Sequence, residues 1–381
     1  MKPFIELSFM PRALASTSKT CFHYLGNISL PGSYVEWSEL IVNLTVHLIE
    51  RYGIGEVRQW FFEVWNEPNL SFFFEGTQED YFELYGHTAR AIKSVDQLLP
   101  VGGPSTSNNA WITELIQYCE TQGIPLDFIS THHYPTDDPL WSGQVSKEYY
   151  DRGVLTQMAV KAKKEGGKYP LYYTEWNSSA KNPDELHDTP YTAALVMKTI
   201  IDNMDLVEAY SFWTYTDIFE EGGQFAGEFY GGYGLQTVHG IPKAAYHTFE
   251  FLHRMGAQKL PVTKEQETVG MLASVKEEKI CIVAYNHHVP DSYIEEQTVS
   301  LRIQHKSLTS AKVYLVDEDH GNAYHMWKEI GAPIYPNTKQ LEELYASSNA
   351  FVFQPDIKIE GEETILEFLL SPHGIAYVEL V

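Results

Sequence analysis

The chain has 381 residues, of which 44% are hydrophobic and 14% aromatic, so it is long enough for two domains with substantial cores. Its 51 acidic and 27 basic residues give a formal net charge of −24. This charge repels nucleic acids and acidic membrane surfaces, and it is compatible with solubility and with a neutral substrate.

Short apolar runs alternate with longer amphipathic segments in the first part of the chain. The short runs predict β-strands, and the helical stripes between them predict α-helices. One of these helices starts at Thr77-Gln78-Glu79-Asp80, which resembles an N-cap followed by acidic residues in the first turn. The predicted strands lie at residues 4–8, 60–64, 101–103, 128–131, 171–174 and 209–213, and the predicted helices at 35–51, 77–98, 110–121, 147–165, 189–203 and 242–255.

The pattern changes after residue 255. Segments such as 280–285, 313–316 and 375–380 alternate in hydrophobicity and are separated by turns, which predicts a β-sandwich. Residues 341–347 are compatible with a short helix or a loop. We therefore expect two domains, an α/β domain at residues 1–255 and a β-sandwich domain at residues 256–381.

Repeated β-α units form either a closed barrel or an open doubly wound sheet. The glycine-rich segment Gly231-Gly232-Tyr233-Gly234 does not follow a strand and open a helix, so it does not match a dinucleotide-binding fingerprint. The absence of that fingerprint favours the barrel.

The three cysteines, Cys21, Cys119 and Cys281, are widely spaced and odd in number. Their spacing suggests neither a disulfide framework nor a metal site, so a cytoplasmic location is the simplest expectation. Glu6, Pro11 and Arg12 interrupt the apolar start of the chain, which argues against a signal peptide.

Two predicted strands each end in a glutamate with tryptophan and asparagine beside it. The first is followed by Trp65-Asn66-Glu67-Pro68, and the second by Glu175-Trp176-Asn177. In a closed barrel these strand ends face each other across the mouth. Pairs of carboxylic side chains cleave glycosidic bonds, and an asparagine before the acid can hydrogen-bond a sugar hydroxyl. The alternative is that both glutamates are solvated residues at strand ends without a catalytic role. The Trp and Asn residues beside both of them favour the catalytic interpretation.

The motif at residues 65–70, with the segments 3–11, 127–134 and 211–221, resembles glycoside hydrolase family 39, and the bacterial β-xylosidases in particular. The likeness covers essentially the whole chain. It implies a (β/α)8 TIM-type barrel followed by a β-sandwich, and retaining hydrolysis of β-xylosides and xylo-oligosaccharides without a metal or cofactor. It also implies that Glu67 is the general acid/base and Glu175 the nucleophile, with carboxyls about 5–5.5 Å apart. The pKa of the acid should then be raised and the nucleophile should be ionised.

The same resemblance assigns further roles around the sugar. His132 would bind substrate, Tyr134 would hydrogen-bond the nucleophile, and Trp213 would form an aromatic floor for the sugar. The expected substrate-binding residues are Asn66, Phe73, His132, Tyr134, Trp213, Glu220 and Glu221. From the residues alone, His132-His133 also fits a core histidine beside an exposed one or, weakly, a metal site, and Glu220-Glu221 also fits a solvated acidic loop.

In the family pattern residues 3–10 correspond to the third barrel strand, so we expect a truncated barrel of about six β-α units instead of eight. Two open strand edges would then invite pairing with an upstream segment or with another copy of the chain. Two other functions stay open. A truncated barrel could be the sugar-binding module of a larger regulatory protein. Residues 178–181 lack the aromatic expected after the nucleophile, which leaves room for another glycoside specificity.

Overall fold

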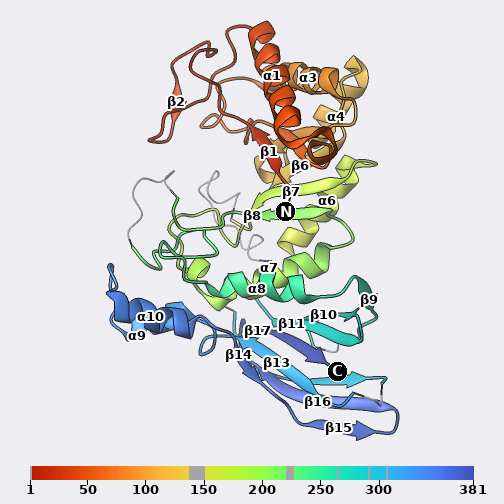
Figure 1. Ribbon diagram of the computed structural model, residues 1–381, viewed down its shortest axis with the longest axis vertical. Helices are drawn as coiled ribbons and strands as arrows, with labels where there is room; N and C mark the ends of the chain where they lie inside the picture. Colours follow the sequence, from red (N-terminus) through yellow and green to blue (C-terminus); the bar gives the residue numbers. More distant parts are fainter. Residues whose placement is uncertain (1, 137–150, 220–226, 264–265, 291, 306–307) are drawn as a thin grey trace.

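The computed structural model describes residues 2–136, 151–219, 227–263, 266–290, 292–305 and 308–381 (Figure 1). Its first part is an α/β unit on a parallel sheet with the strand order β1-β4-β5-β6-β7-β8. The strands are β1 (Phe4–Leu7), β4 (Phe61–Val64), β5 (Val101–Thr106), β6 (Phe128–His132), β7 (Leu171–Trp176) and β8 (Ala209–Phe212). All six predicted strands are present. Within the described residues β1 and β8 each pair with one strand only.

Helices connect the successive strands, as the alternating pattern predicts. They are α1 (Tyr34–Tyr52), α2 (Ile54–Val57), α3 (Gln78–Val95), α4 (Ile112–Gln122), α6 (Val154–Gly166), α7 (Pro190–Asn203) and α8 (Ala244–Arg254), with 3-10 turns η1 (Ser107–Asn109) and η3 (Glu185–Asp188). The helix predicted at 147–165 is α6, and residues 147–150 lie outside the described ranges.

The start predicted for α3 is confirmed in atomic detail. The Thr77 hydroxyl accepts a hydrogen bond from the Asp80 N–H (3.2 Å), and the Asp80 carboxylate accepts one from the Thr77 N–H (2.8 Å). This reciprocal capping box satisfies two N–H groups at the helix start. Further along α3, Thr88 accepts a hydrogen bond from the Trp37 indole of α1 (2.8 Å), so the two helices are joined by a polar contact inside an apolar interface.

The second part consists of two antiparallel sheets packed face to face. The larger has the order β14-β13-β17-β11-β10-β9 and the smaller β12-β16-β15, and both contribute to one apolar core. These strands are β9 (Gln258–Leu260), β10 (Val269–Lys276), β11 (Lys279–Asn286), β12 (Gln297–Ile303), β13 (Ala311–Val316), β14 (Phe351–Phe353), β15 (Ile357–Glu360), β16 (Glu363–Leu370) and β17 (Ile375–Leu380). A small hairpin, β2 (Thr20–Cys21) with β3 (Gly26–Asn27), follows β1.

Two helices interrupt the second part, α9 (Ala323–Glu329) and α10 (Thr338–Ser347). The sequence pattern of residues 341–347 is compatible with a helix or a loop, and the structure has the helix α10 there. Helix α9 was not predicted, because its seven residues are too few for a clear periodic pattern of apolar residues. Asparagine caps start both helices, because the Asn322 side chain accepts from the His325 N–H and the Asn337 side chain from the Gln340 N–H.

The two parts share a core. Helices α7 and α8 lie between them (Figure 1), and their buried residues Met197 and Phe251 belong to the same apolar cluster as Val283 and Tyr377 of the larger sheet. The Phe251 and Tyr377 rings are stacked with centroids 5.9 Å apart. None of the helices formed by the described residues is both long and apolar enough to cross a bilayer.

Candidate active site

Glu67 lies just beyond the carboxyl end of β4, on a sharply turning backbone. Trp65 and Glu67 have φ angles of 68° and 43°, in the left-handed region that residues other than glycine rarely occupy. The Glu67 N–H donates to the Ser105 carbonyl (2.8 Å), and the Glu67 carbonyl accepts from the Leu70 N–H (2.9 Å). Such conformations persist where surrounding bonds hold them, and they occur often at functional sites.

Glu175 lies three strands further along the sheet. The sequence predicted that the strand ends at residue 174, whereas β7 continues through Trp176. The extension follows from pairing on both sides. A register shift against β6 places His132 opposite Glu175, and Trp176 pairs with Phe212 of β8. The shift brings His132 and Glu175 to the same edge of the sheet.

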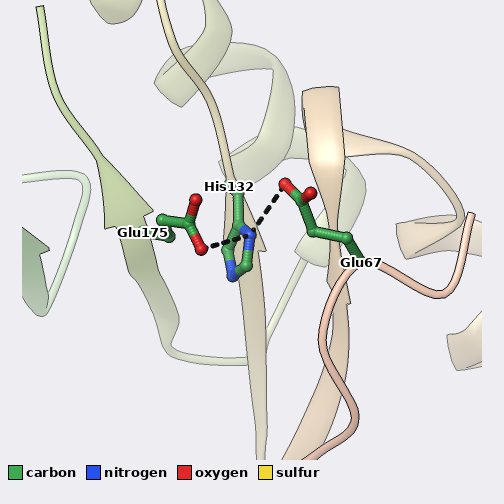
Figure 2. A group of neighbouring side chains, drawn as sticks. All are labelled: Glu67, His132 and Glu175. Atoms are coloured by element: carbon green, nitrogen blue, oxygen red, sulfur yellow. Dashed lines mark hydrogen bonds and ion pairs between the residues drawn. The ribbon is translucent and has the colours of Figure 1, made fainter. Parts of the chain in front are cut away.

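His132 lies between the two glutamates, as Figure 2 shows. Its Nδ1 is 3.1 Å from Glu67 Oε1 and 3.6 Å from Glu175 Oε2. One oxygen of each carboxyl and one His132 nitrogen all lie within 4.8 Å of one another. On its other side the His132 Nε2 is 3.4 Å from the Ser105 hydroxyl. The two carboxyls are therefore close enough to contact one sugar ring.

Tyr134 approaches Glu175 from the loop after β6. Its hydroxyl donates a hydrogen bond to Glu175 Oε1 at 2.6 Å. This is a short, charge-assisted contact when the carboxyl is ionised. Burial and the Glu175 charge raise the pKa of Tyr134 well above its ordinary value, so this hydroxyl keeps its proton and remains a donor.

Burial and mutual charge set the protonation of this group. Burial, opposed by His132 and reinforced by Glu67, raises the pKa of Glu175 to about 8. Burial on its own lowers the pKa of His132, but Glu175 and Glu67 outweigh it and raise that pKa to about 10. Near pH 7 the site without substrate therefore combines an imidazolium with a largely protonated Glu175. The resemblance predicted an ionised Glu175, whereas its burial raises its pKa.

A third buried carboxyl, Glu63, was not singled out by sequence. It lies on β4 and is 2% exposed. The Thr174 hydroxyl, one residue before Glu175, donates to Glu63 Oε1 at 2.7 Å. Burial raises the pKa of Glu63. Its position four residues before Glu67, inside an otherwise apolar strand, is the signal that could have identified it, since buried carboxyls are rare without a specific partner.

The remaining predicted residues lie in different settings. The Asn66 side-chain oxygen is buried and accepts no hydrogen bond from the described residues, so it can accept one from a ligand. Trp213 follows β8, and its carbonyl accepts from the Asn177 side chain (2.5 Å). Phe73 belongs to a ring cluster with Phe22, 5.6 Å away. Glu220 and Glu221 lie outside the described residues.

The spacing of Glu67, His132 and Glu175 would also suit a metal ion. Metal binding requires the neutral imidazole, because a protonated ring nitrogen has no lone pair to donate. In the structure His132 Nδ1 contacts both carboxyls directly.

Comparison with known proteins gives concordant matches. The model described as glycosyl hydrolases family 39 matches residues 1–361. A β-xylosidase from Caldicellulosiruptor saccharolyticus is 48% identical over 391 residues, covering 100% of this chain and 80% of that protein. A β-xylosidase from Geobacillus stearothermophilus is 34% identical, covering 100% and 77%. The crystal structure of a monomeric β-xylosidase from Caulobacter crescentus CB15 has a TM-score of 0.88 at 31% identity, covering 100% of this chain and 81% of that chain.

Proposed function

Because the chain belongs to glycosyl hydrolases family 39, we propose that it is a retaining β-xylosidase that cleaves β-xylosides and xylo-oligosaccharides. The xyloside specificity is supported by the relatives named as β-xylosidases, which match the whole length of this chain. The fold agrees with that of a solved β-xylosidase, and we propose that the six-stranded parallel sheet corresponds to part of a (β/α)8 barrel.

The observation that carries the mechanism is the approach of Glu67 and Glu175 to within 4.8 Å. Retaining glycosidases place their carboxyls about 5–5.5 Å apart, whereas inverting enzymes need about 6.5–9.5 Å to admit a water molecule. In the first step Glu175 attacks the anomeric carbon, the bond to the leaving oxygen breaks, and Glu67 donates its proton to that oxygen. In the second step Glu67 takes a proton from water, the water oxygen attacks the same carbon, and the bond to Glu175 breaks.

Neighbouring residues orient Glu67 and Glu175 and stabilise their ionised forms. The Tyr134 hydroxyl donates to Glu175 and stabilises its ionised form. The His132 cation lies against both carboxyls and stabilises their ionised forms. We propose that Asn66 accepts from a sugar hydroxyl and that Trp213 forms the floor of the site. Phe73, Glu220 and Glu221 stay proposed contacts at its rim.

The direct test is hydrolysis of a p-nitrophenyl β-xyloside by the purified chain and by Glu175→Gln. We expect the variant to lose at least about 10³-fold in kcat, because the nucleophile is gone. Glu208→Gln is the matched control, since Glu208 is an exposed glutamate beside β8 and its replacement should leave kcat unchanged. Proton NMR of the fresh product should show β-xylose first. Unchanged turnover in Glu175→Gln, or α-xylose as the first product, would contradict the proposal.

A further inference from the structure

A buried ionic cluster joins the connection that follows β7 to the connection that follows β8. Lys243, directly before α8, places its Nζ 2.5 Å from Asp188 Oδ1 and 2.7 Å from Asp217 Oδ2. Their three side chains are at most 1% exposed. Asp188 ends η3, and Asp217 lies five residues beyond β8. We call these residues the Lys243 cluster. It contains two carboxyl groups and one ammonium group. Burying these charged groups costs more free energy than burying apolar side chains of similar volume would.

The Lys243 cluster holds the glycine-rich segment 231–234, for which the sequence pattern predicts no role. The Gly231 N–H donates to Asp188 Oδ2 (2.7 Å), the Gly234 N–H donates to Asp217 Oδ1 (2.8 Å), and the Lys243 ammonium donates to the Gly232 carbonyl (2.9 Å). A Cβ atom on Gly232 would lie 2.5 Å from Asp217 Oδ1. The glycines therefore allow the backbone to approach the buried charges closely.

Tyr233 lies between these hydrogen-bonded glycines and connects them to the candidate active site. Its carbonyl accepts from the Thr214 N–H (3.0 Å) and from the Asn177 side chain (3.2 Å). Thr214 directly follows Trp213, and Asn177 lies two residues after Glu175. The same Asn177 side chain also donates to the Trp213 carbonyl at 2.5 Å. One peptide group thus links the backbone of the proposed sugar floor to the end of the strand that bears Glu175.

The Tyr233 side chain reinforces the link. Its hydroxyl donates to the Ala180 carbonyl in the loop after β7 (2.7 Å). Its ring lies 5.5 Å from Phe219, whose ring is 5.6 Å from that of Trp213. Backbone and side chain of Tyr233 therefore act on the same two loops.

We propose that Lys243, Asp188 and Asp217 are positioning residues that set the placement of Trp213, through Tyr233 and Asn177, and so determine how tightly the sugar is held. This inference rests on the proposed function. The cluster does not touch substrate, so its loss should weaken sugar binding more than it slows the chemical step.

The experiment measures kcat and KM for p-nitrophenyl β-xyloside, and the affinity for a non-hydrolysable aryl thio-β-xyloside by calorimetry. The variants are Asp217→Asn, Lys243→Met, Trp213→Ala and the two double variants with Trp213→Ala. Lys259→Met is the control, because Lys259 forms an exposed ion pair with Asp205. Circular dichroism and thermal melting report folding. Asp217→Asn keeps the shape and the acceptor for Gly234, so it tests the inference even where Lys243→Met does not fold.

We expect affinity to fall about 10- to 100-fold in Asp217→Asn and Lys243→Met, since small misplacements of a binding group have effects of this size. KM should rise as the affinity falls, while kcat should change less. In the Trp213→Ala background the same substitutions should change affinity less than twofold, because the group being positioned is absent. Unchanged affinity in a folded Asp217→Asn, or an equal loss with and without Trp213, would overturn the positioning role. Tight binding of the thioxyloside by a chain that shows no turnover would overturn the proposed function alone, and failure to bind it would overturn both.

Discussion

Replacing Tyr134 with phenylalanine removes the 2.6 Å hydrogen bond to Glu175 and leaves the ring in place. A hydrogen bond to a charged group contributes about 1.5–3 kcal/mol, and 1.36 kcal/mol corresponds to one pKa unit. The bond favours the ionised form, so its loss should raise the pKa of Glu175 by about 1–2 units. In the proposed mechanism the reactive state has Glu175 ionised, so the ionisation of Glu175 limits activity on the low-pH side.

The assay is the pH dependence of kcat/KM for an aryl β-xyloside, which reports ionisations of the free enzyme. In Tyr134→Phe the ascending limb should move about 1–2 units to higher pH, so activity below that limb falls about 10- to 100-fold. The descending limb should stay in place, because both states on that side contain ionised Glu175 and lose the same bond. An ascending limb that does not move, in a folded variant, would refute the role of Tyr134 as a donor that stabilises the nucleophile.

Three further outcomes are expected. Glu67→Gln should slow hydrolysis of alkyl β-xylosides far more than that of dinitrophenyl β-xyloside, because a good leaving group needs no proton; equal losses would argue against an acid role. His132→Asn removes a cation that lowers the pKa of Glu175, so the ascending limb of the pH profile should move to higher pH, and a shift to lower pH would contradict this. Thr77→Ala breaks the capping box of α3 and should reduce the free energy of unfolding in urea by about 1 kcal/mol without changing kcat.

Strong periodicity and cap chemistry made the α/β part predictable from sequence. The apolar runs at β4 and β7 and the start of α3 at Thr77 needed only local information. The proximity of Glu67 and Glu175 was predicted from their places at strand ends and from a closed barrel, in which those ends face each other. The division of the chain at residue 255 stays a prediction, since α7 and α8 contribute to the core on both sides of it.

The features that sequence could not supply depend on contacts between distant segments. The apolar strand around Glu63 hinted at its burial, but its hydrogen bond from Thr174 joins two strands distant in sequence. The end of β7 depended on register shifts against β6 and β8. Asp188 lies between β7 and α7, whereas Asp217 and Lys243 lie between β8 and α8, so their contact joins two connections and is not predicted by their spacing.

Helix α8 connects the β-sandwich to the Lys243 cluster near the candidate active site. It starts one residue after Lys243 and, eight residues on, inserts Phe251 against Tyr377 near the carboxyl terminus. A chain cut after residue 255 would keep both glutamates but would uncover one side of this helix. The β-sheets at the end of the sequence therefore support α8, and we expect substitutions that disrupt this packing to weaken sugar binding.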